Sequence, residues 1–405
     1  MLSGPYVVQN FGHLSCDEGD YSMKILIVYH SGALQNALTI FGALVANRSI
    51  ELTVIAPEWV AADKVYDPSG RLEVKRESHA NGYRLLPLPL VDPKRYQLGF
   101  EGEPLRKVIK DFRADVLHVW DEPLSYCLLH VARLRFLVSR KSKVLFYGFQ
   151  NTPFKWDALG RVIWKTAWTQ VAGGAAANSE ALTNLRQAGF PQRRPLERIF
   201  WGIPTDVFKS MDSRALKKEL ALDCEHIVGF VGRLVPEKGL AFLLAAIRRL
   251  PTTIHLLIIG SGPMRAELEM RSTLPGLSER VHLYDVMPSE SLAKYVNCMD
   301  VLAVPSVTTP HWKEQYGRVI GEAMACGVPV VGSDSGAIPE VIASAGLVVP
   351  EGNISALAEA LQTAIFDEER RPEFIKQGLQ RVEQELSIKA MSQRLLGFYS
   401  RILGT

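Results

Sequence analysis

Two glutamates, Glu314 and Glu322, lie eight positions apart in the stretch WKEQYGRVIGEAMACGVPVV (312–331). On one continuous helix, eight residues would separate the carboxylates by about 12 Å along the axis and about 80° around it, so they could not share a small ligand. The residues before Gly317 instead predict a loop, and the helix is expected to begin near Gly317. Glu314 then precedes the helix, and Glu322 lies inside it.

The start of this predicted helix is suited to an anion, because its first backbone N–H groups have no partner within the helix. A diphosphate bound there would have one carboxylate on each side, and carboxylates accept hydrogen bonds from the paired hydroxyls of a sugar or a ribose. Spacing alone also fits a plainer interpretation, in which Glu314 is a solvated loop residue and Glu322 a surface residue. In the binding interpretation, the diphosphate would lie near four consecutive residues: Tyr316, Gly317, Arg318 and Val319.

A second stretch, FVGRLVPEKGL (230–240), ends a predicted strand with Gly-Arg and resumes as a helix after Lys238. Arg233 and Lys238 are therefore expected at the carboxyl edge of a sheet, close to a helix start. Two cations on a glycine-containing turn suit a diphosphate, whose oxygens arginine can bind in a bidentate manner. A solvated pair of basic loop residues is the alternative. IIGSGP (258–263) is a third glycine turn between a strand and a helix.

The rest of the chain alternates short apolar β-rich runs with helical patterns, and it does so twice. Such a pattern predicts parallel sheets covered by helices on both faces, and two sets predict an α/β protein with two Rossmann-like domains. Ligands of such sheets bind beyond the carboxyl ends of the strands, so the site is expected in a cleft between the facing domains. The expected strands are 24–29, 51–56, 115–120, 143–149 and 173–178, then 226–232, 254–260, 280–286, 300–305 and 327–333.

The boundary between the two domains is expected in WGIPTDVFKS (201–210), where glycine and proline interrupt the pattern. Helices expected over 353–367, 369–384 and 388–403 would pack across the junction. The predicted organisation is a disordered extension, two domains and a last helix that returns to the first domain: 1–22, 23–205, 206–385 and 386–405.

Charge is unevenly distributed along the chain. Residues 1–205 hold 25 Lys/Arg and 19 Asp/Glu, a net of +6, and the remaining residues hold 21 and 24, a net of −3. The total of +3 gives no indication of nucleic-acid binding, whereas a basic first half suits an anionic acceptor or a membrane surface, unless it is ordinary scatter. The five cysteines are far apart without C-x-x-C spacing, so neither disulfides nor a zinc site are predicted, and a reducing cytosol is expected.

Together these motifs resemble the retaining glycosyltransferases of family 4, which have the GT-B fold. The resemblance covers the second half densely and the first half mainly through strand order. It rests on Arg233 with Lys238, GSGP (260–263), E-x7-E within KEQYGRVIGEAMACGVPVVGSDSGAIPEVI (313–342), ANSEAL (177–182) and WGIPTDVF (201–208).

The resemblance implies a role for each matching residue. Glu314 would bind hydroxyls of the transferred sugar, and Glu322 the hydroxyls of the ribose. Arg233 and Lys238 would hold the diphosphate and stabilise charge on the departing β-phosphate. Backbone N–H groups at residues 316–318 would assist. The base would be held by backbone around Val286 and Met287.

The same resemblance implies a nucleotide-diphospho-sugar donor, with UDP as the expected nucleotide, and no required divalent metal or other cofactor. The cationic pair and the helix dipole would replace the metal electrostatically, and the sequence contains no D-x-D motif. Front-face displacement would retain the anomeric configuration, and the leaving phosphate would take the acceptor proton.

The first half departs from the family pattern after two strands. Family members often have a Gly-Gly loop after the first strand, whereas YHSGALQ (29–35) offers only Gly32. Many have a histidine after the fourth strand, where this chain has Gln150, which can still donate to a sugar hydroxyl. The acceptor side is expected to include His30, Asp121, Glu122 and Asn151, although Asp121 and Glu122 also fit an ordinary strand-to-helix cap.

The expected function is transfer of a hexose to a hydroxyl of a saccharide or lipid-linked saccharide, in polysaccharide or glycolipid assembly. A GT-B nucleotide-sugar epimerase and a non-catalytic nucleotide-sugar-binding subunit remain alternatives. The expected location is cytoplasmic, with peripheral contact at the inner face of the plasma membrane. Basic-aromatic stretches at 131–143 and 154–168 support that contact, unless Trp164 and Trp168 pack in the core.

Overall fold

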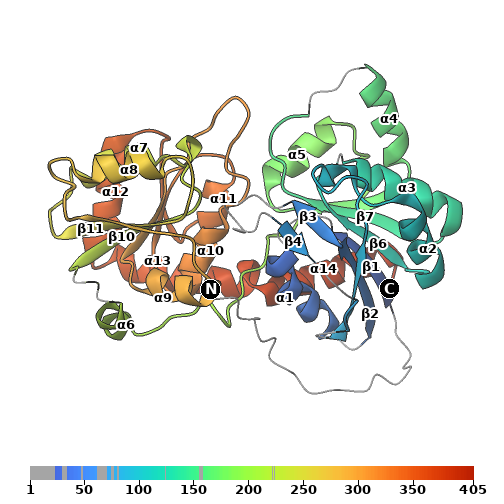
Figure 1. The fold of residues 1–405 in the computed structure, drawn as a ribbon, viewed down its shortest axis with the longest axis horizontal. Helices are drawn as coiled ribbons and strands as arrows, with labels where there is room; N and C mark the ends of the chain where they lie inside the picture. Colours follow the sequence, from blue (N-terminus) through green and yellow to red (C-terminus); the bar gives the residue numbers. More distant parts are fainter. Residues whose placement is uncertain are drawn as a thin grey trace.

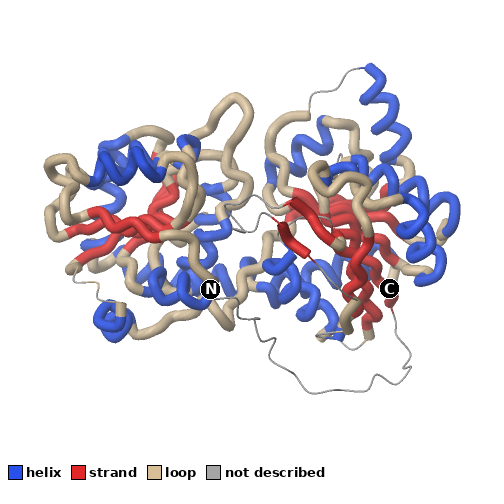
Figure 2. The backbone as a smooth tube through the Cα atoms, viewed as in Figure 1, coloured by secondary structure: helices blue, strands red, loops and turns tan. Residues whose placement is uncertain are grey.

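The structure, a computed structural model, consists of two lobes that lie side by side, each built around a parallel sheet (Figure 1). Figure 2 shows the strands of each sheet with helices around them. The expectations for the extension over 1–22, for His30 and for Gly32 lie outside the residues that the structure describes. Those residues are 23–29, 34–46, 49–61, 71–73, 77–79, 82–123, 125–154, 158–220, 222 and 224–405.

The sheet of the N-terminal lobe has the strand order β5-β2-β1-β6-β7-β8-β9, and every neighbouring pair is parallel. A short antiparallel pair, β3 (Trp59–Ala61) and β4 (Arg71–Glu73), stands apart from it. The strands of the sheet are β1 (Met23–Tyr29), β2 (Ile50–Pro57), β5 (Arg84–Leu88), β6 (Val116–Trp120), β7 (Lys143–Gly148), β8 (Val171–Ala176) and β9 (Leu196–Arg198). The helices are α1 (Leu34–Val45), α2 (Gly102–Phe112), α3 (Tyr126–Val138), α4 (Ala158–Trp168) and α5 (Ser179–Gln187).

The sheet of the C-terminal lobe has the order β12-β11-β10-β13-β14-β15 and is also parallel throughout. Its strands are β10 (His226–Val231), β11 (Ile254–Ile259), β12 (Val281–Tyr284), β13 (Val301–Val304), β14 (Val330–Ser333) and β15 (Gly346–Val349). Its helices are α6 (Ser213–Glu219), α7 (Leu240–Ile247), α8 (Arg265–Ser272), α9 (Ser289–Asn297), α10 (Arg318–Ala325), α11 (Ile338–Ile342), α12 (Ile354–Phe366) and α13 (Arg370–Arg381). The predicted α/β class with two parallel sheets is confirmed.

Each sheet reverses its strand order once, between β1 and β6 in the first lobe and between β10 and β13 in the second. At such a switch point the loops leave neighbouring strands in opposite directions, which opens a crevice at the carboxyl edge. The residues that follow β6, β10 and β13 are therefore the ones that the fold presents for binding.

The sequence analysis missed several short elements at the edges of the sheets. β5 contains Pro87, β9 has three residues and β15 has four, and a short strand carries little periodic signal. Helix α2 was missed as well, although its apolar residues Leu105 and Ile109 are buried and four positions apart. All ten strands that the sequence predicts are nevertheless present in the two sheets.

The chain passes between the lobes in two segments that lie side by side. Ile203 donates a backbone hydrogen bond to Leu386 (N···O 2.7 Å) and accepts one from Ile388 (3.1 Å). After this crossing, α14 (Ile388–Leu403) packs against α1 of the N-terminal lobe (Figure 1). Its Tyr399 hydroxyl lies 2.7 Å from Nδ1 of His118 on β6. The predicted domain limits at 205/206 and 385/386 stay a prediction.

The described residues contain no helix long and apolar enough to cross a membrane. Trp164 and Trp168 of α4 are buried, with ring centroids 5.2 Å apart, and belong to the apolar core of the N-terminal lobe. Core packing is therefore the correct interpretation of these two tryptophans.

Candidate active site

Lys238 lies at the switch point of the C-terminal sheet because of a glycine that follows it. Gly239 has a φ of 72°, and a Cβ there would lie 1.8 Å from the carbonyl oxygen of Pro305. Only glycine allows this approach of the turn after β10 to the loop after β13. The Lys238 ammonium reaches Glu314, with Nζ 2.5 Å from Oε2, and lies 4.9 Å from the centre of the Trp312 ring.

Glu314 is buried, with 7% of its surface exposed, and its position is fixed at both side chain and backbone. The Ser306 hydroxyl donates to Glu314 Oε2 at 3.1 Å, next to the Lys238 ammonium. The carbonyl oxygen of Glu314 accepts from the Asn151 side-chain amide (2.8 Å) and from the Ala337 N–H (2.9 Å). Glu314 is thus not a solvated loop residue, and three loops and the opposite lobe hold it in place.

Helix α10 begins at Arg318, directly after Gly317, whose φ of 73° is left-handed. Among the residues that the structure describes, none accepts a hydrogen bond from the backbone N–H groups of residues 316–319. The predicted helix start is confirmed, with Glu314 before it. The N–H groups and the helix dipole together favour an anion at this point.

Glu322 lies inside α10 and is 3% exposed, so it is not the surface residue of the plainer interpretation. Its Oε1 lies 2.8 Å from Nε of Arg318, one helical turn earlier. Burial raises the pKa of the Glu322 carboxyl, and the Arg318 guanidinium opposes that increase. Tyr316 is also buried, and its hydroxyl donates to the Trp201 carbonyl at 2.6 Å, so only its backbone is available to a ligand.

Arg233 lies in the loop after β10, and the backbone of this loop packs against the glycine turn after β11. The Leu234 N–H donates to the Ser261 carbonyl at 2.8 Å, and a Cβ on Gly260 would lie 1.9 Å from the Gly232 carbonyl oxygen. The side chain of Arg233 is 37% exposed, and its closest described acidic partner is Glu237, with Nη2 3.9 Å from Oε1. This loose pairing leaves the guanidinium able to turn toward an anion.

Asp121 and Glu122 follow β6, at the switch point of the first sheet. Glu122 accepts from the N–H groups of Phe149 (3.2 Å) and Gln150 (2.9 Å), and so holds the loop after β7. Burial, together with the neighbouring Asp121 carboxylate, raises the pKa of Glu122 to about 7, although the hydrogen bonds from the Gln150 and Phe149 N–H groups oppose that increase. Burial also raises the pKa of Asp121 to about 6. The cap interpretation is wrong, because the N-cap of α3 is Ser125, whose hydroxyl accepts from the Leu128 N–H at 3.2 Å, while the Glu122 carboxylate holds the loop after β7.

Gln150 and Asn151 differ in their surroundings. Gln150 is half-buried, with Nε2 3.5 Å from the Thr152 hydroxyl, while Asn151 is fully buried. Asn151 donates to Glu314, and its own carbonyl accepts from the Asn184 amide at 2.8 Å. Direct contact of Asn151 with the acceptor substrate stays a prediction. In the structure, its side-chain amide contacts the loop that carries Glu314.

Four further residue pairs tie the lobes together beside this loop. The Asn178 amide at the start of α5 donates to Phe149 in its own lobe (2.9 Å) and to the Gln315 carbonyl in the other (2.8 Å). Lys313 forms an ion pair with Glu180. Glu340 accepts from the Ser179 N–H at 2.9 Å and pairs with Arg198.

The position expected to hold the base lies after β12, at the edge of the C-terminal sheet. Val286 is 55% exposed and Met287 is half-buried. Asp285, immediately before them, was not singled out from the sequence. Its carboxylate is 85% exposed and lies 3.0 Å from Nη1 of Arg265. An exposed carboxylate at a strand end can accept hydrogen bonds from a base.

The sequence analysis also missed Asn178 and Ser306. The motif ANSEAL holds Asn178, whose side chain caps α5 by accepting from the Ala181 N–H at 2.7 Å, so the capping signal was readable. Its second task, bridging to Gln315, depends on how the lobes meet. No sequence pattern pointed to Ser306, since a serine at the end of a strand is common.

Comparison with known proteins gives the class. The family model described as "Glycosyl transferases group 1" matches residues 212–381. A GDP-mannose-dependent alpha-(1-6)-phosphatidylinositol monomannoside mannosyltransferase of Mycolicibacterium smegmatis is 28% identical over 353 residues, 84% of this chain and 87% of that protein. An alpha-maltose-1-phosphate synthase of the same organism is 30% identical over 275 residues, 62% of this chain and 70% of that protein. The chain therefore belongs to the group 1 glycosyl transferases, and it is a glycosyltransferase.

Solved structures agree on the fold. The crystal structure of Anabaena Alr3699/HepE in complex with UDP matches with a TM-score of 0.73 at 20% identity, covering 94% of this chain and 100% of that one. A glycosyltransferase from Rickettsia africae ESF-5 matches with a TM-score of 0.75 at 14% identity, covering 94% and 98%. The GT-B fold predicted from the sequence is confirmed.

Proposed function

We propose that this glycosyltransferase moves a hexose from a nucleoside diphosphate sugar to a hydroxyl acceptor and retains the anomeric configuration, as family 4 enzymes do. One observation carries the proposal: the Lys238 ammonium, the Glu314 carboxylate and the start of α10 meet at the switch point of the C-terminal sheet. Cations and backbone N–H groups suit the diphosphate, and the carboxylate suits sugar hydroxyls.

In this proposal the charged side chains bind different parts of the donor. Arg233 and Lys238 bind the diphosphate, and Glu314 turns to the hydroxyls of the hexose when the diphosphate takes over the Lys238 ammonium. Glu322 accepts from the ribose hydroxyls, held by Arg318. The backbone N–H groups of residues 316–319 stabilise charge that develops on the β-phosphate, which is the most effective place for fixed dipoles.

The reaction needs no protein base. The bond between the sugar C1 and the β-phosphate oxygen breaks, and the acceptor oxygen forms its bond to C1 on the same face. The acceptor proton passes to the departing phosphate. Since Lys238, Arg233 and the helix start supply the positive potential, we propose that no divalent metal takes part.

For the base, we propose guanine in place of the uracil expected from the sequence. The supporting observation is Asp285, an exposed carboxylate beside Val286 and Met287. The edge of guanine offers two neighbouring N–H donors, whereas the corresponding edge of uracil offers one. The mycobacterial relative named as GDP-mannose-dependent supports the same choice.

The acceptor is proposed to bind beside Asp121, Glu122 and Gln150 of the N-terminal lobe. A saccharide or glycolipid hydroxyl suits these half-buried polar groups. Exposed apolar residues on α3 and α4 support contact with a membrane that carries a lipid-linked acceptor: Phe136, Leu137, Val162 and Ile163. Exposed cations on the same helices, including Arg133 and Lys165, would suit anionic headgroups.

The proposal is tested with purified protein, a panel of GDP-, UDP- and ADP-hexoses and simple glycoside or lipid-linked acceptors, with and without EDTA. We expect acceptor-dependent release of GDP that EDTA leaves unchanged, and NMR of the product should show the donor's anomeric configuration. Conversion of the donor sugar without any acceptor would instead identify an epimerase. Donor binding without turnover by any acceptor would indicate a binding subunit.

A further inference from the structure

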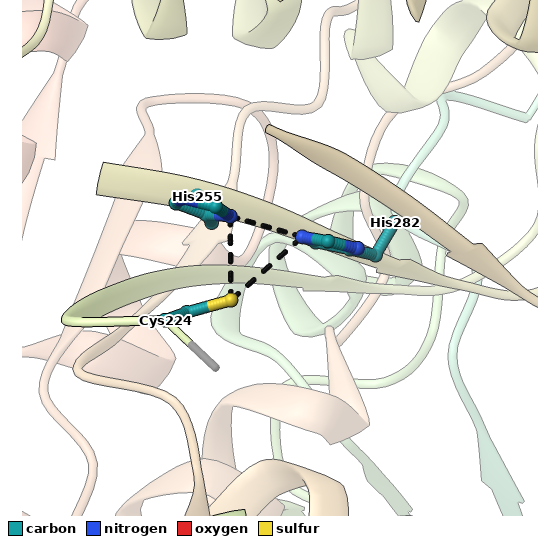
Figure 3. Close-up of side chains that lie close together, drawn as sticks. All are labelled: Cys224, His255 and His282. Atoms are coloured by element: carbon teal, nitrogen blue, oxygen red, sulfur yellow. Dashed lines mark hydrogen bonds between the residues drawn. The ribbon is translucent and has the colours of Figure 1, made fainter. Parts of the chain in front are cut away.

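Cys224, His255 and His282 form a cluster at the amino edge of the C-terminal sheet (Figure 3). His255 is the second residue of β11 and His282 the second of β12. His282 is in register with Leu257, two positions after His255, so both imidazoles point to the same face. Cys224 comes from the segment before β10, and Figure 3 shows its sulfur directed at the two rings.

The three side chains lie at distances close to those of ligands that share one metal ion. Cys224 Sγ is 3.3 Å from His255 Nδ1 and 3.7 Å from His282 Nε2, and these two nitrogens are 3.0 Å apart. Around a tetrahedral Zn²⁺, with its usual bond lengths, two nitrogens lie about 3.3 Å apart and a nitrogen and a sulfur about 3.6 Å. Small rotations of the rings would bring both nitrogens to a common ion.

We propose that Cys224, His255 and His282 form a binding site for Zn²⁺, with water at the fourth position. One thiolate and two imidazoles are ligands that zinc prefers, and an all-oxygen ion such as Mg²⁺ or Ca²⁺ is not suited to them. Binding releases the thiol proton of Cys224 to solvent. All three residues are half-buried, so an ion can enter and a water can complete its coordination.

The segment that carries Cys224 is already held near the sheet. Lys217 of α6 places its Nζ 3.2 Å from the Glu225 carbonyl oxygen and 3.5 Å from that of Cys224. An ion bound by the cluster would join this segment to β11 and β12, and so link α6 to two strands. Its expected role is structural: it stabilises the amino edge of the C-terminal sheet.

This site is separate from the donor site. His255 is at the amino end of β11 and Gly260 directly follows its carboxyl end, about 16 Å farther along the strand. The metal would therefore lie on the opposite edge of the sheet from Arg233 and Lys238, and the proposal is independent of the metal-free transfer proposed above.

The test is binding of ZnCl2 and CoCl2 to the purified full chain. We expect one Zn²⁺ per chain in competition with a chromogenic chelator, and with Co²⁺ a thiolate charge-transfer band together with the intense visible bands of tetrahedral cobalt. Cys224→Ser and His282→Gln should each weaken Zn²⁺ binding by more than about 100-fold, since even partners outside the ligand shell change affinity by about 10–100-fold. The matched controls are Cys16→Ser and His79→Gln, which should bind as the parent does.

A second measurement covers the case in which a variant does not fold. In the parent protein, Zn²⁺ should protect Cys224 from alkylation, which mass spectrometry can measure at this residue. Cys224 is the cysteine to monitor, because the other described cysteines are buried. It should also raise the Tm of the parent but not that of Cys224→Ser. Equal Zn²⁺ affinity in parent and Cys224→Ser, or alkylation of Cys224 that Zn²⁺ leaves unchanged, would overturn the proposal.

Discussion

Lys238 and Glu314 are 76 residues apart in the sequence, and their Nζ and Oε2 atoms lie 2.5 Å apart in the structure. The pair joins the turn after β10 to the loop before α10, at the switch point of the sheet. Both partners are largely buried, with 18% and 9% of their side chains exposed. In the proposed reaction these are two halves of the donor site, the cation for the phosphate and the carboxylate for the sugar.

Glu314→Gln should remove most of the transferase activity, by about 10²–10³-fold, because an interaction directed at the reacting sugar is lost. The amide keeps the shape but leaves the Lys238 ammonium without its anion, so the free energy of unfolding should fall by about 1–3 kcal/mol. Steady-state kinetics and chemical denaturation check both. The exposed Glu290→Gln is the matched control, and full activity in Glu314→Gln would contradict the assignment.

Lys238→Met should lower kcat by about 10²–10³-fold, because the cation is expected to act on charge that appears on the departing phosphate. Product inhibition by the free nucleoside diphosphate should weaken too, as it carries the same phosphates. Kinetics with and without EDTA separate this cation from a metal. A strict metal requirement of the parent enzyme would contradict the proposed electrostatics.

Asn178 offers a test of the contacts between the lobes. Asn178→Asp keeps the oxygen that caps α5 but loses the N–H groups that bind Phe149 and Gln315. Because Asn178 is fully buried, the new carboxylate would face the Phe149 and Gln315 carbonyl oxygens. We therefore expect both activity and stability to fall, and stability to fall further than in Asn178→Ala, which loses the cap at about 1 kcal/mol. Measurements of kcat/KM and of thermal unfolding check this for the two variants. Equal loss of stability in both would contradict this order.

Glu122 should make stability depend on pH. Its folded-state pKa is raised to about 7 from an ordinary 4.5, so the folded state holds its proton more tightly than the unfolded state. The free energy of unfolding should therefore fall as the pH rises from 4.5 to 7, by about 2–3 kcal/mol for this group. In Glu122→Gln, this contribution to the pH dependence of the free energy of unfolding should be absent. Urea denaturation at several pH values measures the difference between the variants.

Membrane contact is tested on α4, whose Val162 and Ile163 are 63% and 43% exposed. The double change Val162→Asp with Ile163→Asp should reduce cosedimentation with anionic phosphatidylglycerol vesicles. Activity on a short water-soluble acceptor should stay unchanged, since these residues lie outside the proposed donor site. Unchanged vesicle binding by the folded variant would show that another surface, or none, meets the lipid.

Much of the fold follows from the sequence, because long apolar strands alternate with helices twice along the chain. Local signals also placed the helix start at Gly317, with Glu314 before it and Glu322 inside it. The short edge strands β9 and β15 were missed, since a run of three or four residues owes its place to the neighbouring strand and not to its own pattern. The contact of Ser306 with Glu314 was missed too, because it depends on the tertiary structure and not on a local pattern.

The sequence by itself determined where the glycine turns and the start of α10 lie, because these are local features of the chain, and from them it predicted which residues bind a diphosphate and a sugar. Only the tertiary structure decided that Lys238 would pair with Glu314, that Asn151 and Asn178 of one lobe would hold the loop of the other, and that the Asp285 carboxylate would be exposed. It also brought together Cys224, His255 and His282, a cluster that the spacing of the cysteines did not predict. Parallel strands place residues about 30 positions apart side by side, and no local pattern records that register.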